Sequence, residues 1–359
     1  MGKPIRRGKS KMRTKRIVIC ASQTPFVHGG AEILVESLYR QLMERGWPVE
    51  VVRVPFRWYP KEEILKGYLA WRLLDLTEGE GQKIDLVIAT KFPSFVVQHP
   101  NKVTWLIQQF RQAYELYGTE HSHFTNDPED RRLREAIWHI DTLTLSESRR
   151  LFAISRNVAD RLARYNGLQA QVLYPPPKHE GLYRNDGYGD YLLVVSRLNR
   201  WKRVNLVIEA MPYVRSAARL LIVGTGNEEE ALKRLAKKRG VADKVEFLGY
   251  VDHHQLLDLY ANCFAVFYAP YDEDYGLATV EAFKSQKSVL TTADSGGVLE
   301  FVEDSVTGYV TSPGEAQQLA YHIGQLFADR ALCRRLGEAG HEKVCDITWD
   351  YAIERLIEG

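Results

Sequence analysis

Cysteine is scarce in this sequence. The 359-residue chain has only four cysteines, Cys20, Cys263, Cys333 and Cys345, and none of them forms a CxxC pair. This scarcity argues against a disulfide-stabilised secreted domain and against a zinc site of paired cysteines. Cys20 and Cys263 lie within apolar runs, so we expect buried thiols in a reducing compartment.

Long hydrophobic runs are also lacking. No apolar run approaches the roughly 18 residues that a membrane-spanning helix requires. The apolar run RIVICAS, residues 16–22, is too short for the hydrophobic region of a signal peptide. We therefore expect a cytoplasmic protein.

The chain has no strong excess of charge of either sign, apart from its first residues. The formal net charge is +2, which gives no sign of a nucleic-acid partner. Residues 3–16, however, contain eight lysines and arginines and no acid. Residues 1–15 are either a disordered solvated arm or part of a peripheral contact, through residues 3–16, with anionic lipid at the inner face of a membrane.

Short apolar runs alternate with helical periodicity along the whole chain. This alternation is typical of α/β proteins with parallel sheets. The length favours two domains, and 45% apolar residues suit a globular protein. The expected strands are 16–22, 48–54, 84–90, 103–109, 151–156 and 171–175 in the first half, and 191–196, 219–224, 245–250, 263–270, 288–293 and 308–312 in the second.

Turn and helix signals suggest where the domains begin and end. Leucines at 34, 38 and 42 share one face of an expected helix that begins near Ala31, with Gly46 as its C-terminal cap. Three prolines, 175–177, followed by a polar, Gly-rich stretch, indicate a linker. Helical periodicity follows each second-half strand except the last two. We expect an N-terminal domain over 16–177, a C-terminal domain over 178–345 and a final helix within 346–359.

The most informative segment is EDYGLATVEAFKS, which begins at Glu273. Two carboxylates, Glu273 and Glu281, flank Gly276, where an expected strand and loop turn into a helix. Glycine allows close approach of the backbone, and the amides of Gly276, Leu277 and Ala278 would point at an anion with the helix dipole behind them. Such an arrangement suits a phosphate next to sugar hydroxyls.

A second turn between strand and helix carries bases. In SRLNRWK, Arg197 follows the expected strand 191–196, and Lys202 lies where the next helix begins. A departing diphosphate develops negative charge, and without a metal ion, paired cations and backbone amides must neutralise it. The alternative interpretation is two ordinary surface cations.

Other local patterns have competing interpretations. Asp272-Glu273-Asp274 reads as DxD, which elsewhere coordinates a metal bound to a nucleotide diphosphate, but the nearby cations make a metal redundant. Glu120-His121-Ser122-His123 lies in a polar loop without a third ligand at a known spacing. Gly224 and Gly226 follow a strand like a dinucleotide loop, yet the third glycine is missing. The sequence therefore predicts neither a metal nor another cofactor.

Together these motifs resemble a retaining glycosyltransferase of family 4, from Arg16 to the end of the chain. SRLNRWK resembles the family's Arg/Lys phosphate motif, EDYGLATVEA its E-x7-E motif, and FVHGGAE and SGGVLEFV its two Gly-Gly motifs. The resemblance implies the GT-B fold, α/β with two facing Rossmann-like domains of doubly wound parallel sheet. It also implies catalysis without a metal ion, with the acceptor on the side of the N-terminal domain and the donor on the side of the C-terminal domain. The final helix, within 346–359, would cross back to the N-terminal domain.

The resemblance also implies roles for individual residues. Arg197 and Lys202 would hold the donor pyrophosphate, Glu281 the ribose, and Glu273 the donor sugar as the main catalytic candidate. Further donor contacts would come from Gly276, Leu277, Ala278, Gly224, Gly29 and Gly30, and from the backbone of Tyr250 and Val251 at the base. Many relatives have a histidine near the reaction centre, where this chain has Gln108 and Gln109. These two glutamines and His28 are therefore the acceptor-side candidates.

The leading hypothesis is transfer of a sugar, with retention, from a nucleotide diphosphate to a saccharide or lipid-linked saccharide. A UDP-sugar such as UDP-glucose is favoured, and a GDP-mannose-dependent mannosyltransferase is the runner-up. The alternatives are a nucleotide-sugar epimerase of similar fold and a non-catalytic nucleotide-sugar-binding protein. The epimerase would need acid and base residues that the sequence does not reveal.

Overall fold

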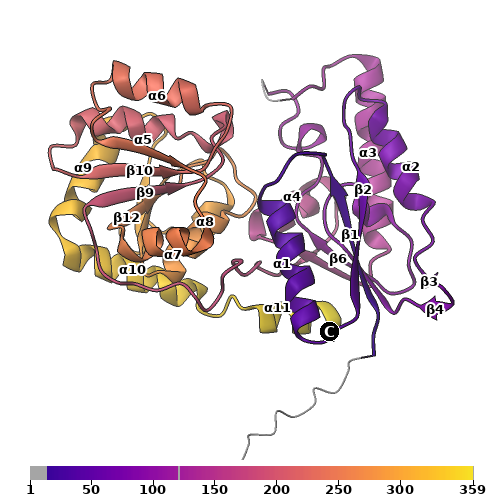
Figure 1. The fold of residues 1–359 in the computed structure, drawn as a ribbon. Helices are drawn as coiled ribbons and strands as arrows, with labels where there is room; N and C mark the ends of the chain where they lie inside the picture. The colour runs from indigo at the N-terminus through magenta and orange to yellow at the C-terminus, as the bar shows by residue number, and fades with distance from the viewer. Residues whose placement is uncertain (1–13, 120–121, 359) are drawn as a thin grey trace, which may run out of the picture. The chain divides into compact units, whose positions relative to one another are not determined.

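The computed structural model describes residues 14–119 and 122–358, which divide into two compact units (Figure 1). Of the described residues, unit 1 contains those up to Ile154, then Ala159–Leu173 and those from Ile353 onward. Unit 2 contains Ser155–Val158 and Tyr174–Ala352. Most of the basic arm, residues 1–13, lies outside the described residues, as do Glu120 and His121.

Unit 1 is built on a six-stranded parallel sheet with the order β2-β1-β5-β6-β7-β8. Its strands are β1 (Ile17–Gln23), β2 (Val49–Pro55), β5 (Leu86–Ala89), β6 (Lys102–Leu106), β7 (Arg150–Ala153) and β8 (Gln171–Val172). A separate antiparallel pair joins β3 (Glu78–Gly79) to β4 (Gln82–Lys83). The central strands are continuous apolar runs because both faces of a parallel sheet are covered.

The helices of unit 1 follow the strands in alternation. They are α1 (Gly30–Glu44), α2 (Glu63–Arg72) and α3 (Pro128–Ser146), with 3-10 turns η1 (Ser94–Val96) and η2 (Arg111–Ala113). Two helices, α4 (Arg156–Asn166) and α11 (Trp349–Ile357), have residues in both units. The leucines at 34, 38 and 42 are buried, which confirms the predicted apolar face of α1.

Unit 2 is built on a second six-stranded parallel sheet with the order β11-β10-β9-β12-β13-β14. Its strands are β9 (Tyr191–Val195), β10 (Arg219–Val223), β11 (Val245–Gly249), β12 (Ala265–Phe267), β13 (Ser288–Thr292) and β14 (Gly308–Thr311). Its helices are α5 (Asn205–Ala210), α6 (Glu229–Lys238), α7 (His253–Asn262), α8 (Leu277–Lys284), α9 (Ala316–Ala328) and α10 (Arg330–Val344), with turns η3 (Arg200–Lys202), η4 (Met211–Tyr213) and η5 (Gly297–Glu300).

The helices of unit 2 cover both faces of its sheet. Figure 1 shows α5, α6 and α9 on one side of β9 and β10, and α7, α8 and α10 on the other. The core between the sheet and the first group is formed by aliphatic residues of both, such as Leu192, Ile222, Ile208 and Ile323. The sheet of unit 2 is therefore doubly wound, as the predicted fold class requires.

Each sheet has one point where the strand order reverses direction. In unit 2 this point lies between β9 and β12, and in unit 1 between β1 and β5. In open α/β sheets, ligands bind outside the carboxyl ends of the strands at this switch point, because the connecting loops diverge there. The carboxyl ends of β9 and β12 are followed by the two motifs of bases and acids.

Most of the predicted elements are confirmed. All six predicted strands of each half are present, and Cys20 and Cys263 are buried. The expectation that no helix follows the strand at 308–312 is wrong, since α9 and α10 come after it. In the part of the chain that the structure describes, no helix has the length and apolar character needed to span a membrane.

Candidate functional site

The structure brings Lys202 and Glu273 together at the unit 2 switch point. Lys202 ends η3, just after β9, and Glu273 follows β12. The Lys202 Nζ donates to Glu273 Oε2 at 2.5 Å and to the Tyr268 hydroxyl at 2.8 Å. Arg197 leaves the same end of β9 and is exposed, and no ion pair joins it to this cluster within the described residues. The cluster therefore has one paired cation and one exposed cation.

The Lys202–Glu273 pair is largely shielded from water. Only 13% of the Lys202 side chain and 26% of the Glu273 side chain are exposed. Burial works to lower the pKa of Lys202, but the charge of Glu273 and the hydrogen bonds to Glu273 and Tyr268 outweigh it, so the pKa lies above its ordinary value. Lys202 therefore stays a cation at neutral pH.

Arg203, next to Lys202, joins three loops of the site through the hydrogen bonds of its side chain. Its guanidinium donates to the carbonyls of Ala269 and Pro270 after β12. It also forms a bidentate pair with the Asp294 carboxylate after β13, with both N–O distances 2.7 Å. Arg203 has a left-handed backbone with φ of 47°, so the contacts of its side chain offset a backbone conformation that is unfavourable for a side chain of this size.

The backbone of Glu273 is held by the Gly296-Gly297 pair. The Glu273 N–H donates to Ser295 O at 3.2 Å, and the Gly297 N–H donates to Glu273 O at 2.7 Å. A Cβ at Gly296 would lie 2.6 Å from Glu273 O, closer than side chains tolerate. These glycines thus allow the acid-bearing loop to lie directly against the end of β13.

Helix α8 begins immediately after the acid. Gly276 is its N-cap residue with φ of 88°, and a Cβ there would lie 2.7 Å from a Val298 methyl. The first amides of α8, starting at Leu277 and Ala278, have no partners within the helix. The helix therefore presents N–H groups and the positive end of its dipole beside Lys202 and Glu273.

Glu281 lies in the second turn of α8 and is 9% exposed. Its carboxylate accepts hydrogen bonds from the Tyr183 hydroxyl at 3.1 Å and from the Tyr260 hydroxyl at 2.8 Å. Burial raises the pKa of Glu281 to about 7, although both tyrosine hydrogen bonds and the charge of Lys178 work in the opposite direction.

Other predicted donor residues lie at the neighbouring strand ends. Tyr250 and Val251 follow β11, and Tyr250 is 86% exposed. Gly224 follows β10, where a Cβ would lie 1.8 Å from Ser196 O. The structure thus explains this glycine by the close approach of two strand ends, and its contact with a donor stays a prediction.

The predicted residues of unit 1 lie at two places. Gly29 caps α1, and its N–H donates to the Glu32 carboxylate at 2.9 Å, while Gly30 begins the helix. His28 is exposed, with its ring 3.8 Å from the Glu36 carboxylate. His28 and Gly29 lie on the loop that follows β1, at the unit 1 switch point, and Gly30 is the first residue of the helix after it.

The glutamines fit an acceptor site less well. Gln108 is partly exposed after β6. Gln109 is 1% exposed, and its amide donates to Asn166 Oδ1 at 2.6 Å. Because Gln109 is buried and bound to Asn166, it does not suit contact with an acceptor.

The structure gives no support to the DxD interpretation. Asp274 is buried, and the Glu273 carboxylate is bound to Lys202. Across residues 14–119 and 122–358, no group of three or more His, Cys, Asp or Glu side chains is placed to hold a metal ion.

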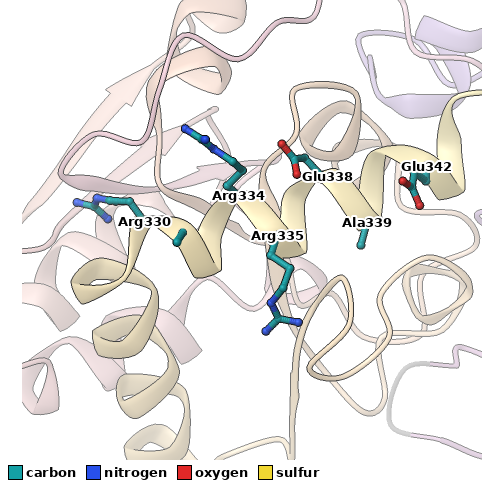
Figure 2. A pocket seen from close by; sticks show the side chains of 7 residues that line it. Arg330, Arg334, Arg335, Glu338, Ala339 and Glu342 are labelled. Atoms are coloured by element: carbon teal, nitrogen blue, oxygen red, sulfur yellow. The ribbon is translucent and has the colours of Figure 1, made fainter.

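A surface hollow lies elsewhere in unit 2, along α10. Arginines at 330, 334 and 335 and glutamates at 338 and 342 line it. Figure 2 shows that Arg334 and Glu338 point to one side of the helix and Arg335 to the other. Because these side chains do not converge, the hollow does not compete with the switch point as a candidate site.

Comparison with known proteins finds similarity to glycosyltransferases. Residues 183–343 match the family model of the glycosyl transferases group 1. Over 350 residues the chain is 25% identical to N-acetyl-alpha-D-glucosaminyl L-malate synthase of Bacillus anthracis, covering 88% of this chain and 89% of that protein. Over 178 residues it is 32% identical to a GDP-mannose-dependent alpha-(1-6)-phosphatidylinositol monomannoside mannosyltransferase of Mycobacterium tuberculosis, covering 46% of each. A match to an uncharacterised glycosyltransferase of Methanocaldococcus jannaschii, at 30% identity, spans 36% of that protein.

Solved structures share the fold over nearly the whole chain. Sucrose-phosphate synthase from Thermosynechococcus elongatus has a TM-score of 0.74 at 18% identity, covering 96% of this chain and 98% of the other. An Anabaena protein in complex with UDP and glucose has a TM-score of 0.71 at 18% identity, covering 96% and 99%. The chain therefore has the GT-B fold, and the predicted fold class is confirmed.

Three residues of the site were missed at the level of sequence. Arg203 joins groups 66 to 91 positions away, and Tyr183 lies 98 positions from Glu281. Tyr260 is 21 positions from Glu281, on the preceding helix. The one local signal was a buried glutamate on a helix, which requires polar partners but does not identify them.

Proposed function

We propose that the protein is a retaining glycosyltransferase of family 4. It transfers a sugar from a nucleotide diphosphate to a saccharide or lipid-linked saccharide acceptor. The observation that carries this proposal is the Lys202–Glu273 pair at the unit 2 switch point, beside the N-terminus of α8. A cation, an acid and free amides at one strand edge suit a diphosphate joined to a sugar.

In this proposal, each group acts on one part of the donor. Lys202, Arg197 and the first amides of α8 neutralise the charge that develops on the departing diphosphate. Glu281 accepts hydrogen bonds from the ribose hydroxyls. Glu273 contacts the transferred sugar and offsets positive charge at its anomeric carbon. Because cations and amides supply the positive charge, the reaction needs no metal ion.

A UDP-sugar, with UDP-glucose first, is the favoured donor. An Anabaena protein of the same fold was solved with UDP and glucose, which supports this choice. The mycobacterial relative is named as GDP-mannose-dependent, which keeps GDP-mannose as the second candidate. We expect the enzyme to act in the cytoplasm, either free or at the inner face of the membrane through residues 3–16.

The other two functions have less support. An epimerase would need acid and base groups around the sugar, and this proposal assigns only Glu273 to the sugar. A non-catalytic binding protein would not require a cation paired with an acid beside the sugar. The presence of Arg197, Lys202, Glu273 and Glu281 together favours catalysis.

A panel of radiolabelled nucleotide sugars tests the proposal. The protein is incubated with each donor and a mixture of saccharide acceptors, and free nucleotide and labelled product are measured. Release of nucleotide together with labelled acceptor supports transfer. Conversion of the donor sugar without release of nucleotide would instead show an epimerase, and binding without any reaction would show a non-catalytic protein.

A further inference from the structure

The two tyrosines that bind Glu281 come from separate parts of unit 2. Tyr260 belongs to α7 and is 0% exposed, and Tyr183 belongs to the segment that precedes β9. Their rings pack edge to face with centroids 6.1 Å apart. The hydroxyls reach different oxygens, Tyr183 to Oε1 and Tyr260 to Oε2. The carboxylate is therefore fixed from two sides by rigid aromatic groups.

This arrangement leaves acceptor capacity on both oxygens. Each oxygen of an ionised carboxylate has two lone-pair sites, and each tyrosine uses one of them. The remaining sites lie in one carboxylate plane with a fixed spacing. Glu281 as a whole residue is 9% exposed, so it is not completely enclosed by the protein. Two adjacent hydroxyls of a ligand could each donate to one oxygen.

The tyrosines also favour the ionised form of the acid. Burial raises the pKa of Glu281 to about 7, and the hydrogen bonds from Tyr260 and Tyr183 work against this rise, as does the charge of Lys178. A protonated carboxyl group would offer an O–H donor in place of one acceptor. Loss of either tyrosine hydroxyl would thus loosen the orientation of Glu281 and disfavour its charge.

We propose that Tyr183 and Tyr260 are positioning residues that orient the Glu281 carboxylate to accept both hydroxyls of a ribose. The inference rests on the proposed function, because it requires the nucleotide to bind at Glu281. It extends that function by assigning selection for ribose over deoxyribose to three side chains rather than one. The two tyrosines do not touch the nucleotide themselves.

Binding of ribonucleotides and deoxyribonucleotides tests this inference. Affinities of UDP, GDP, 2′-deoxy-UDP and 2′-deoxy-GDP are measured by calorimetry for the wild type and for Tyr183→Phe, Tyr260→Phe and Glu281→Gln. Tyr191→Phe is the matched control, because its hydroxyl donates to Leu259 O, one residue before Tyr260, and not to Glu281. The wild type should prefer the ribonucleotide by about tenfold or more, the range of a hydrogen bond to a charged group.

Both tyrosine variants should lose most of this preference, whereas the control should keep it. Their affinity for the ribonucleotide should also fall off at a higher pH than that of the wild type, because the acid is then protonated more readily. A merely structural role would weaken both nucleotides equally and leave the pH midpoint in place, and that result would overturn the inference. Tighter binding by Tyr183→Phe would also overturn it, since the hydroxyl would then block the ribose.

The Glu281→Gln protein separates failure of the inference from failure of the proposed function. If Glu281→Gln loses the ribose preference and the tyrosine variants keep it, only the positioning role is wrong. If Glu281→Gln keeps the preference, or if the wild type binds none of the nucleotides, the proposed function and the inference both fail.

Discussion

Asp141 in unit 1 and Glu281 in unit 2 are two buried carboxylates, and each accepts hydrogen bonds from two tyrosine hydroxyls. Tyr68 and Tyr114 donate to Asp141 at 2.5 and 2.6 Å, as Tyr183 and Tyr260 donate to Glu281. Burial raises the pKa of each acid to about 7. Asp141 is 0% exposed, whereas Glu281 retains 9%.

Close to each of these acids in the sequence is a glutamate that pairs with a lysine. In unit 1, Lys102 lies 3.3 Å from Glu147, just after the helix that carries Asp141. Lys102 is the first residue of β6, so this pair lies at the amino end of a strand. In unit 2, Lys202 and Glu273 follow the carboxyl ends of β9 and β12.

The two pairs have the same residue types and differ in the sheet edge at which they lie, and the proposed function assigns binding only to the pair at the carboxyl edge. Lys102 Nζ donates to the carbonyls of Phe95 and Thr144, and these hydrogen bonds hold η1 against the end of α3. At the carboxyl edge, the same residue types lie beside the free amides of α8. We therefore expect an anionic ligand at the second arrangement and not at the first.

The largest expected contrast is between the two glutamates of these pairs. Glu273→Gln should lower sugar transfer by about 10²-fold or more, because it removes one preorganised charge at the reacting sugar. Nucleotide binding should survive. Initial rates of transfer measure the effect, with Glu147→Gln as the matched control.

Glu147→Gln should lower the stability of the protein instead, since it leaves Lys102 buried without its acid. Transfer by the folded control should stay within a few-fold of the wild type. Equal losses of transfer in the two variants would show that the comparison between the sheet edges is mistaken.

The second contrast is between the two tyrosine-bound acids. Glu281→Gln should weaken binding of the nucleotide diphosphate by roughly 1.5–3 kcal/mol, through loss of charged hydrogen bonds. Asp141→Asn should leave that affinity unchanged and lower the free energy of unfolding by about 1–3 kcal/mol, because an amide donor then faces a tyrosine hydroxyl. Calorimetry and urea unfolding measure the two quantities. If Asp141→Asn weakened nucleotide binding and Glu281→Gln did not, Glu281 would not belong to the nucleotide site.

The pH dependence should also separate the two acids: both should affect stability, but only Glu281 should affect nucleotide affinity. Both acids have a folded pKa of about 7, above ordinary values of 3.8 and 4.5, so each contributes stability at low pH that is lost as pH rises through 7. Nucleotide affinity should have the opposite trend and fall below pH 7, because only ionised Glu281 accepts both hydroxyls. Asp141→Asn should keep this trend in affinity. Glu281→Gln should retain only the titration of the phosphate itself, and an unchanged profile in that variant would contradict the assignment.

The smallest expected effect is that of a chelator. Lys202 and Arg197 supply positive charge where a metal would otherwise be needed, so EDTA should change the rate of transfer by less than about twofold. Loss of activity with EDTA, and recovery with Mg²⁺ or Mn²⁺, would revive the DxD interpretation of Asp272–Asp274.

The sequence was sufficient for the sheets and for the positions of the motifs. Parallel strands are buried on both faces, so they appear as apolar runs such as YLLVVS and RLLIVG, and the structure contains them all. Gly276 was informative because its left-handed backbone and the close Val298 require glycine. Helices α9 and α10 were missed after β14, although Leu319, Ile323 and Leu326 have helical spacing.

The sequence could not show how the side chains are held. The contacts of Arg203 and of Glu281 join residues from separate strand ends, and no local pattern encodes such pairs. The sequence also did not single out Asp141 as a buried acid, because nothing in the local pattern shows that Tyr68 and Tyr114 bind it. Conversely, Gln109 resembled a site residue by position but is buried against Asn166.

The most direct measurement is amide hydrogen exchange with and without saturating nucleotide diphosphate. UDP and GDP are each tested, and the one that binds is used. We expect slower exchange in the first turn of α8, from Leu277 to Val280, and around η3, with no local change around Asp141. Protection confined to α10 or to the neighbourhood of Asp141, with α8 unchanged, would contradict the claim that the carboxyl edge of the unit 2 sheet is the donor site.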